Sequence, residues 1–406
     1  MNAISTVTHI EAVIKVAERC NINCTYCYVF NKGNEAAIKR PAKMSRSTMM
    51  DTLTFLRDGA KQMKAKSLSI VLHGGEPLML GKCDFDFFLS QIESTFEDEI
   101  DIRVGIQTNA MLINDEWIDL FEKHKVSVGV SLDGPKETND KERRDHRGHG
   151  TYTRTVSGLI KLQDAARRGR LLGYPGIISV IDPTSSGRET YRHFVDELGV
   201  HSMSFHLPMD TYESFGRRDP MPYATFICDV FDEWARDNNP EIYVRMFDQF
   251  LKFLRNAPRA DEAKCNSVLL QHLTVESDGA ITIDELKPTL RDESSLNVSG
   301  CKLLQFVNSD IAINIRRLKS KLANECTVCV WKAYCRGGLL HGAQANRWSN
   351  ERGFNNKSVL CSALKKIYAH MAYNALAAGL DINCVTKSLA NYDIDFESAA
   401  LENSEA

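Results

Sequence analysis

Three cysteines near the start of the chain could together do chemistry. Cys20, Cys24 and Cys27 follow the pattern C-x3-C-x2-C, just after an apolar stretch at residues 12–17. Soft thiolates at such spacing bind zinc or an iron–sulfur cluster. A closed structural site takes four protein ligands, whereas a site with three protein ligands keeps one position open. The loop is therefore predicted to bind a metal centre to which something else can bind.

A second group of cysteines lies in the last third of the chain. Cys326, Cys329 and Cys335 follow the pattern C-x2-C-x5-C, and Cys361 comes further downstream. Four thiolates can close either an iron–sulfur cluster or a structural zinc site, and both remain open on this pattern. Either centre would leave no position for a substrate.

Hydrophobic patterning predicts the elements that position these residues. Short apolar, β-branched runs alternate with amphipathic helical stretches. Strands are predicted at residues 12–16, 68–72, 102–107, 126–131, 176–181 and 202–206. Helices are predicted at residues 47–64, with Ser47 as the N-cap, and at 85–97, 115–123 and 154–168. Six strand–helix repeats favour a parallel barrel or an open parallel sheet over a sandwich.

Polar residues and glycines follow the predicted strands, where barrels of this kind place their chemistry. The first strand leads into the cysteine loop. The motifs after the other strands are Gly74-Gly75-Glu76-Pro77, Gln107-Thr108-Asn109, Ser131-Leu132-Asp133-Gly134-Pro135, Val180 with Asp182, and His206. Any one of them could be only a turn. Their recurrence at five or six strand ends predicts one shared site.

The cysteine loop, with Tyr26 before its last cysteine, resembles the signature of radical S-adenosylmethionine (SAM) enzymes. The resemblance implies a partial (β/α)6 TIM barrel whose [4Fe–4S] cluster is held by Cys20, Cys24 and Cys27. In this family SAM chelates the fourth iron, and the reduced cluster cleaves SAM to a 5′-deoxyadenosyl radical. That radical abstracts a hydrogen atom from the substrate.

Further residues match SAM contacts of the family. Residues 74–77 resemble its GGEP motif, which lies under the methionyl amino group and here comprises Gly74, Gly75, Glu76 and Pro77. Ser131 matches a serine that contacts SAM in related maturases. Arg143 resembles the arginine of an H-D-x-x-R motif that pairs with the methionine carboxylate, although Asn139 replaces the histidine. Asn109 and Val180 lie where the sugar and the adenine would pass.

The second cysteine group resembles the SPASM extension of radical SAM peptide maturases. The resemblance implies that Cys326, Cys329, Cys335 and Cys361 ligate an auxiliary [4Fe–4S] cluster. The full SPASM pattern has seven cysteines, but Asp284 and Leu339 replace two of them, which leaves only Cys265 and Cys301 for a further cluster. One auxiliary cluster, and two clusters in total, are therefore expected.

Several phrases around these cysteines narrow the resemblance. Residues 276–287, 335–339 and 353–361 resemble maturases that form three-residue cyclophanes in ribosomal peptides, the XYE and Fxs types. The implied substrate is a short ribosomal precursor peptide with a leader, and flavodoxin or ferredoxin is the implied electron donor. The radical would remove a Cβ hydrogen, and the resulting carbon radical would attack an aromatic ring two positions earlier.

Loss of an electron and a proton would then restore aromaticity. The auxiliary cluster could take the electron, and Asp284 or Glu285 could take the proton. His206, at a strand end facing the expected cavity, is the histidine to test. Two alternatives remain: a maturase that forms thioethers or formylglycine, and a non-catalytic, zinc-stapled peptide-binding protein.

Bulk composition limits the remaining function classes. The chain has 406 residues and a net charge of −3, which argues against nucleic acid as its main partner. A signal peptide and a membrane span are not recognised, so the twelve cysteines favour a reducing, cytoplasmic setting and metal ligation over disulfides. The predicted division is a radical SAM barrel at 1–235, a helical bridge at 236–263, a SPASM-like domain at 264–365, and a C-terminal helix with an acidic tail at 366–406.

Overall fold

The computed structural model describes residues 9–33, 36–96, 100–255, 273–283, 296–314, 321–341 and 344–390. Its strands form one sheet in the order β7-β6-β5-β4-β3-β2-β1-β8-β9, parallel throughout except for the β8–β9 pair. The strands are β1 His9–Ala17, β2 Ser67–Gly74, β3 Asp101–Thr108, β4 Ser127–Ser131, β5 Gly176–Val180, β6 Ser202–His206, β7 Tyr243–Val244, β8 Leu273–Val275 and β9 Ile281–Ile283. The six predicted strands and the parallel α/β barrel architecture are confirmed.

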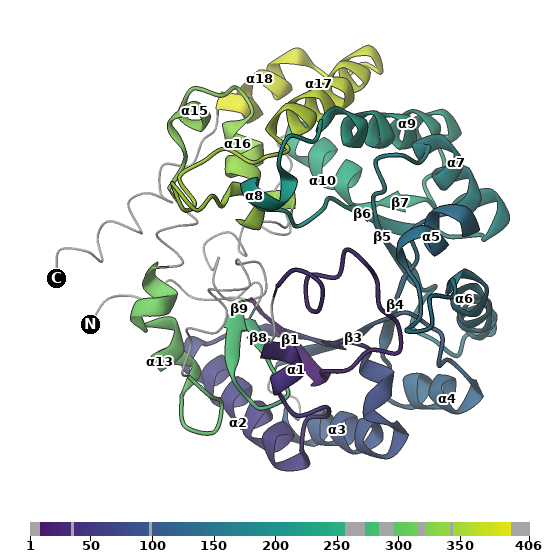
Figure 1. The fold of residues 1–406 in the computed structure, drawn as a ribbon, viewed down its shortest axis with the longest axis vertical. Coiled ribbons are helices and arrows are strands. Elements are labelled where there is room, and N and C mark those ends of the chain that lie inside the picture. Colours follow the sequence, from purple (N-terminus) through teal and green to yellow (C-terminus); the bar gives the residue numbers. More distant parts are fainter. Residues whose placement is uncertain are drawn as a thin grey trace.

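Helices follow the strands and cover the outside of the curved sheet (Figure 1). In the first half they are α1 Ala36–Lys39, α2 Arg46–Met63, η1 Pro77–Leu80, α3 Lys82–Thr95, α4 Asp115–Lys123, α5 Lys136–Glu142, α6 Tyr152–Arg167, α7 Gly187–Arg192 and η2 His193–Glu197. The predicted helix at 115–123 has those bounds, but the predicted N-cap Ser47 is wrong. Ser45 caps α2 instead, because its extended backbone lets its Oγ accept the amide hydrogen of Thr48.

The second half is mostly helical. Its helices are α8 Tyr212–Phe215, α9 Met221–Asp237, α10 Arg245–Leu254, α13 Leu303–Val307, α15 Asn324–Thr327, α16 Lys332–Cys335, η3 Arg336–His341, η4 Gln344–Arg347, α17 Cys361–Ala377 and α18 Ile382–Ala390. The predicted boundary at residue 235 lies inside α9, and the division into domains stays a prediction. Across the described ranges, no helix is long and apolar enough to cross a membrane.

Strand alternation places the core between sheet and helices. In β2, Leu68, Ile70 and Leu72 are fully buried, whereas the residues between them are half-buried. β1 has the same alternation at Ile10 and Ile14. Because successive side chains of a strand point to opposite faces, the buried set packs under the helices and the other set faces the concave side. This packing fixes the strand ends that carry the candidate site.

The β8–β9 hairpin extends the barrel sheet beside β1, although the sequence places it in the second module. A buried ion pair joins the two: Lys15 Nζ lies 3.1 Å from the carboxylate of Glu276, directly after β8. Thr282 Oγ1 also donates to Glu276, at 2.6 Å. The amide of Ser277 donates to Glu18, at 3.3 Å. The strand before the cysteine loop is therefore tied to the hairpin that precedes the second cysteine group.

Candidate functional site

The Cys20–Cys27 loop is held by main-chain contacts to the segment that follows β4. The amide of Asn23 donates to the Arg144 carbonyl at 2.7 Å, and the amide of Thr25 donates to the Glu142 carbonyl at 3.1 Å. Inside the loop, the amide of Cys27 closes a turn onto the Cys24 carbonyl at 3.0 Å. Cys24 is buried, and Cys20 and Cys27 are partly buried. The loop is thus fixed by contacts more than a hundred residues away in sequence.

The glycine pair after β2 brings that strand close to the cysteine loop. Gly74 has φ +145°, and a Cβ there would lie 2.0 Å from the Ala17 carbonyl oxygen. A Cβ on Gly75 would lie 2.5 Å from the Arg19 carbonyl. The amide of Gly75 also donates to Ala17 at 2.8 Å. Glycine is required at both positions because two backbone segments approach closely there, and this requirement does not depend on a ligand.

Glu76 ties three elements together at this edge. Its Oε1 accepts the Thr108 hydroxyl at 2.6 Å and the Leu78 amide at 3.2 Å, and its Oε2 accepts the Asn109 amide at 2.8 Å. Burial raises the pKa of the Glu76 carboxyl, while these donors and the Arg143 charge lower it. The adjoining Pro77 opens the short helix η1. Glu76 thus fixes the end of β3 against the end of β2.

A buried chain of polar groups joins the cysteine loop to β4. The Tyr26 hydroxyl donates to Asp133 Oδ2 at 2.6 Å and accepts from Arg143 at 2.7 Å. Asp133 Oδ1 accepts the amide of Val180 at 3.0 Å. Burial raises the pKa of the Asp133 carboxyl, and the Arg143 charge opposes this shift. Asp133 belongs to the motif at residues 131–135 but is not among the site residues that the sequence predicts. The signal in the sequence that points to Asp133 is its position directly after a strand, where the other predicted site residues also lie.

Arg143 keeps an unused donor. The side chain is buried, and its Nε has no hydrogen-bond partner among the residues that the structure describes. A buried guanidinium with a free donor fits a negatively charged ligand, because an unsatisfied buried donor is costly. Arg143 could therefore donate to a carboxylate, such as the methionine carboxylate of SAM that the sequence resemblance implies.

The other predicted SAM contacts lie at the same edge. Ser131 accepts from the Gln107 side-chain amide at 2.8 Å. The Asn109 side-chain amide donates to Asn21, inside the cysteine loop, at 2.7 Å. Val180 pairs with His206 across β5 and β6. The carboxyl ends of six neighbouring strands thus bring the predicted residues into one arc.

His206 ends β6 on the concave side. Its side chain is exposed, yet protein surrounds it closely enough to lower the pKa of its imidazole from 6.5 to about 4. Desolvation is the larger cause, and repulsion by the Arg245 guanidinium adds to it. His206 is therefore neutral near pH 7. Two other predicted residues, Asp284 and Glu285, lie outside the described residues, as does Cys265.

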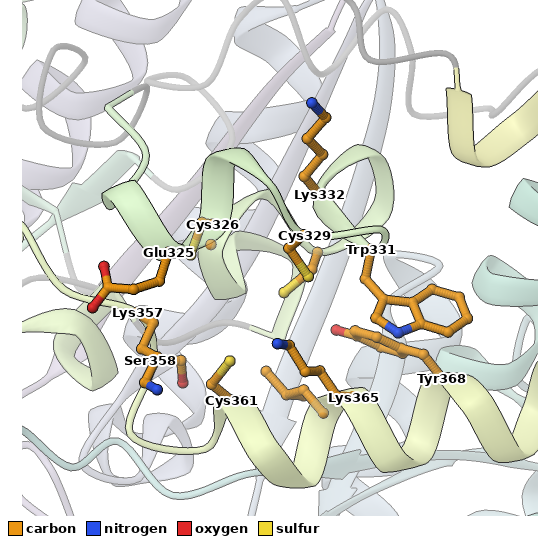
Figure 2. Close-up of a pocket in the computed structure, with 13 residues that line it drawn as sticks. Glu325, Cys326, Cys329, Trp331, Lys332, Lys357, Ser358, Cys361, Lys365 and Tyr368 are labelled. Carbon is orange, nitrogen blue, oxygen red and sulfur yellow. The ribbon is translucent and has the colours of Figure 1, made fainter.

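The second cysteine group lines one cavity of about 60 Å³. Cys326 and Cys329 flank a turn, Cys335 ends α16, and Cys361 begins α17. Figure 2 shows Cys329 and Cys361 pointing toward one another, with the amine of Lys365 beside them. Cys301 is not among the residues that line this cavity.

Both cysteine groups have the donor set that an iron–sulfur cluster requires. Burial raises the pKa of the Cys20 thiol to about 12 and those of Cys24 and Cys335 to about 11. Such thiols are stable as thiolates only when bound to a metal. Within the described ranges, no three His, Cys, Asp or Glu side chains converge on a single metal ion. An iron–sulfur cluster does not require such convergence, because each thiolate binds a different iron and the sulfur atoms can lie further apart.

Comparison with known proteins defines the class. Residues 14–180 match the model of the Radical SAM superfamily. Residues 14–180 are therefore a radical SAM domain, and the chain is homologous to enzymes that carry this domain. The match covers the barrel from β1 to β5, including the cysteine loop and the motifs at the next strand ends.

Two curated relatives match most of the chain. It is 25% identical over 379 residues to the cysteine-type anaerobic sulfatase-maturating enzyme of Clostridium novyi, covering 88% of this chain and 94% of that protein. It is 22% identical over 378 residues to the serine-type enzyme of Bacteroides thetaiotaomicron, covering 87% of each.

Solved structures show the same fold. anSMEcpe with bound AdoMet and the Cp18Cys peptide matches with a TM-score of 0.75 and 22% identity, over 91% of this chain and 98% of that chain. Streptococcus suis SuiB bound to the precursor peptide SuiA matches with a TM-score of 0.60 and 20% identity, over 87% and 76%. The fold is therefore a radical SAM barrel followed by a SPASM-type module. The cyclophane subtype suggested by the sequence is not confirmed.

Proposed function

We propose that Cys20, Cys24 and Cys27 hold a [4Fe–4S] cluster that binds SAM, and that Cys326, Cys329, Cys335 and Cys361 hold one auxiliary [4Fe–4S] cluster. When bound, the first cluster and SAM supply a 5′-deoxyadenosyl radical. The observation that carries this proposal is the placement of the three-cysteine loop, Arg143 and Asp133 at one sheet edge. The buried, unused Nε of Arg143 supports binding of the methionine carboxylate there.

The remaining residues at this edge have distinct roles in the proposal. Tyr26, fixed by Asp133 and Arg143, limits the space beside the cysteine loop. Ser131 and Asn109 offer polar side-chain groups toward SAM, and Val180 offers an apolar surface to its adenine. Residues 74–77 hold the backbone beneath the methionyl amino group, with Glu76 as the fixed negative charge.

We propose that the substrate is a ribosomal precursor peptide with a leader, and that the hydrogen atom comes from a side-chain Cβ. The names of the solved relatives support a peptide, because two of them were solved with one bound. The finer proposal is a carbon–carbon crosslink to an aromatic ring, which forms a cyclophane. Asp284 or Glu285 accepts the proton, and an electron carrier such as flavodoxin or ferredoxin serves the clusters. His206, neutral near pH 7, is a further candidate to contact the peptide.

Formylglycine formation is the second candidate. The curated relatives favour it, because several are named sulfatase-maturating enzymes. The sequence argues against it through the missing auxiliary cysteine positions at Asp284 and Leu339. Both reactions start with hydrogen abstraction from a Cβ, so they differ only after that step.

One anaerobic experiment tests these proposals together. The protein is loaded with iron and sulfide and given SAM, reductant and peptides deuterated at one Cβ. One peptide set carries an aromatic residue two positions before the labelled residue, and the other carries a labelled cysteine or serine. Deuterium in 5′-deoxyadenosine identifies the abstraction site. A product that has lost the transferred deuterium and one ring hydrogen and does not react with a hydrazide is the crosslink. A product that reacts with a hydrazide is formylglycine.

The controls define what each failure means. A Cys24→Ala protein should form no 5′-deoxyadenosine. If the wild type carries a full iron complement yet cleaves no SAM, the radical assignment fails and the zinc-stapled binding protein becomes the leading alternative. SAM cleavage without deuterium transfer from either set would reject both peptide reactions.

A further inference from the structure

We infer that Arg347 is a positioning residue for the auxiliary cluster, and that its buried guanidinium supplies the positive charge that offsets the cysteine thiolates. Arg347 is the last residue of η4 and is 1% exposed. A buried cation is costly unless an anion lies beside it. The inference rests on the auxiliary cluster of the proposed function and adds the residue that balances its charge.

Backbone carbonyls hold the Arg347 side chain in place. Its Nη2 donates to the Lys321 carbonyl at 2.5 Å and to the Phe354 carbonyl at 3.0 Å. Its Nε donates to the Asn356 carbonyl at 3.2 Å. Neutral acceptors from two segments of the chain therefore fix the guanidinium. Among the described residues, its Nη1 has no hydrogen-bond partner, so one charged donor group is left for a ligand.

The charge of Arg347 has no carboxylate beside it in the part of the chain that the structure describes. Burial lowers the pKa of its guanidinium, and the charges that oppose this shift belong to the Cys326 and Cys335 thiolates. The other arginine found buried in that part, Arg143, has the charge of Asp133 nearby. Arg347 therefore has cysteines in the position where Arg143 has a carboxylate.

The Arg347 guanidinium lies against a wall of the four-cysteine cavity. Gly337 lines this cavity, and a Cβ on Gly337 would lie 3.6 Å from both Cζ and Nη1 of Arg347. Cys326 and Cys335 line the same cavity. Burial raises the pKa of both thiols, so they are uncharged near pH 7 until a metal binds them. Metal binding thus creates the anion that Arg347 lacks.

The same charge should also set how easily the centre is reduced. One electron makes a cluster of four thiolates more negative, and no bond forms or breaks. A fixed positive charge nearby therefore stabilises the reduced form more than the oxidised form, and burial strengthens this effect. Arg347 should accordingly favour binding of the cluster and raise its reduction potential.

A redox titration of the full chain tests the inference without relying on turnover. The parent protein is Cys20→Ala/Cys24→Ala/Cys27→Ala, which keeps only the four-cysteine site for a cluster. In this parent, Arg347→Gln removes the charge but keeps an amide donor, whereas Arg347→Lys keeps the charge and loses the planar fork. Dithionite with mediator dyes sets the potential, and electron paramagnetic resonance measures the reduced cluster. Iron and sulfide are counted in every variant.

Loss of the charge should make the cluster harder to reduce. Arg347→Gln should lower the equilibrium constant for one-electron reduction about 10-fold, as expected for one buried charge-assisted contact. This change corresponds to a midpoint potential about 59 mV more negative. Arg347→Lys should recover most of the loss. The matched control is Lys365→Met, which removes an exposed charge that also acts on Cys361. It should change the constant by less than about 2-fold, because solvent screens it.

The possible failures have different meanings. Equal midpoint potentials for Arg347→Gln and its parent would overturn the inference. Equal loss of iron and sulfide from Arg347→Gln and Arg347→Lys would also overturn it, because Arg347 would then only hold backbone carbonyls. Loss of the cluster from Arg347→Gln alone would support the inference, because charge would then decide binding. A parent protein that binds no iron–sulfur cluster would instead reject the auxiliary cluster of the proposed function.

Discussion

The two cysteine sites are positioned in different ways. The Cys20–Cys27 loop is held by distant segments: Asn23 binds Arg144, Asn21 binds Asn109, and Tyr26 binds Asp133. At the four-cysteine site, the main-chain hydrogen bonds of the cysteines close short-range turns, such as the bond from the Cys329 amide to the Cys326 carbonyl at 3.2 Å. The main-chain bonds at the first site therefore cross the barrel, whereas those at the second stay local, and its two segments meet where Tyr334 and Tyr368 pack on Phe250 of α10.

Their surroundings differ as well. Buried charged groups, Glu76, Asp133 and Arg143, lie around the first site, while exposed lysines lie around the second. Fixed buried charges suit a site that must orient a polar ligand, because they need no reorganisation. A cationic surface over a closed site suits contact with another protein. The difference agrees with the proposal that the first site carries the chemistry and that the second holds a closed auxiliary cluster.

Removing one cysteine from each site should give the largest effect. Cys24→Ala should abolish formation of 5′-deoxyadenosine, because the SAM-binding cluster loses one of three protein ligands. Cys329→Ala should retain SAM cleavage without peptide but lose peptide modification. Liquid chromatography with mass spectrometry measures both products. The comparison breaks down if Cys329→Ala also abolishes SAM cleavage while the first cluster stays loaded.

The contact between the barrel and the β8–β9 hairpin should give the next largest effect. Lys15→Met leaves the buried Glu276 carboxylate without its closest cation, at 3.1 Å. Breaking a buried ion pair in this way costs about 3–5 kcal/mol of unfolding free energy. The control Lys123→Met breaks the exposed pair with Asp86 and should cost less than about 1 kcal/mol. Denaturant unfolding measures both, and equal losses would show that the hairpin contact is not special.

The sequence predicted the parts of this architecture that depend on local pattern. The six strands follow from short apolar, β-branched runs, and the helix at 115–123 follows from its amphipathic pattern. In the structure, β2 alternates buried and half-buried residues, and Asn114 caps the helix. The grouping of Cys326, Cys329, Cys335 and Cys361 in one cavity also follows from short spacing and one returning segment.

Long-range contacts could not be read in the same way. The pairing of Asp133 with Tyr26, 107 residues apart, depends on how β4 meets the cysteine loop. The placement of β8 beside β1 depends on a crossover from the second module. The motif at residues 74–77 points to Gly74 and Gly75, but the sequence does not show that the Ala17 and Arg19 carbonyls are what exclude a Cβ there. The bases proposed from sequence, Asp284 and Glu285, remain predictions.

A substitution at Arg143 tests whether its buried guanidinium binds SAM at the first site. Arg143→Lys keeps the charge but removes the planar fork, so one buried charge-assisted contact to SAM should be lost. Such a contact contributes about 1.5–3 kcal/mol, which corresponds to a Kd for SAM that is about 10- to 100-fold higher. Equilibrium dialysis under anaerobic conditions measures this Kd. Arg144→Lys, at the exposed neighbouring position, should leave the Kd for SAM unchanged. Neither variant should change the spectrum of the auxiliary cluster.

His206 should give the smallest effect and tests how far the surrounding protein lowers the pKa of its imidazole. The imidazole has a pKa of about 4, so it should stay neutral from about pH 5 to about pH 7. Because the folded-state pKa lies below the ordinary 6.5, any stability linked to neutral His206 is present above pH 6.5 and lost as pH falls toward 4. Modification by diethyl pyrocarbonate, which requires neutral imidazole, should therefore proceed at a constant rate over that range. Arg245→Ala removes the repelling charge and should raise the pKa toward 6.5, so that the rate falls at the acidic end. An unchanged profile in Arg245→Ala would leave desolvation as the sole cause and place Arg245 outside the site.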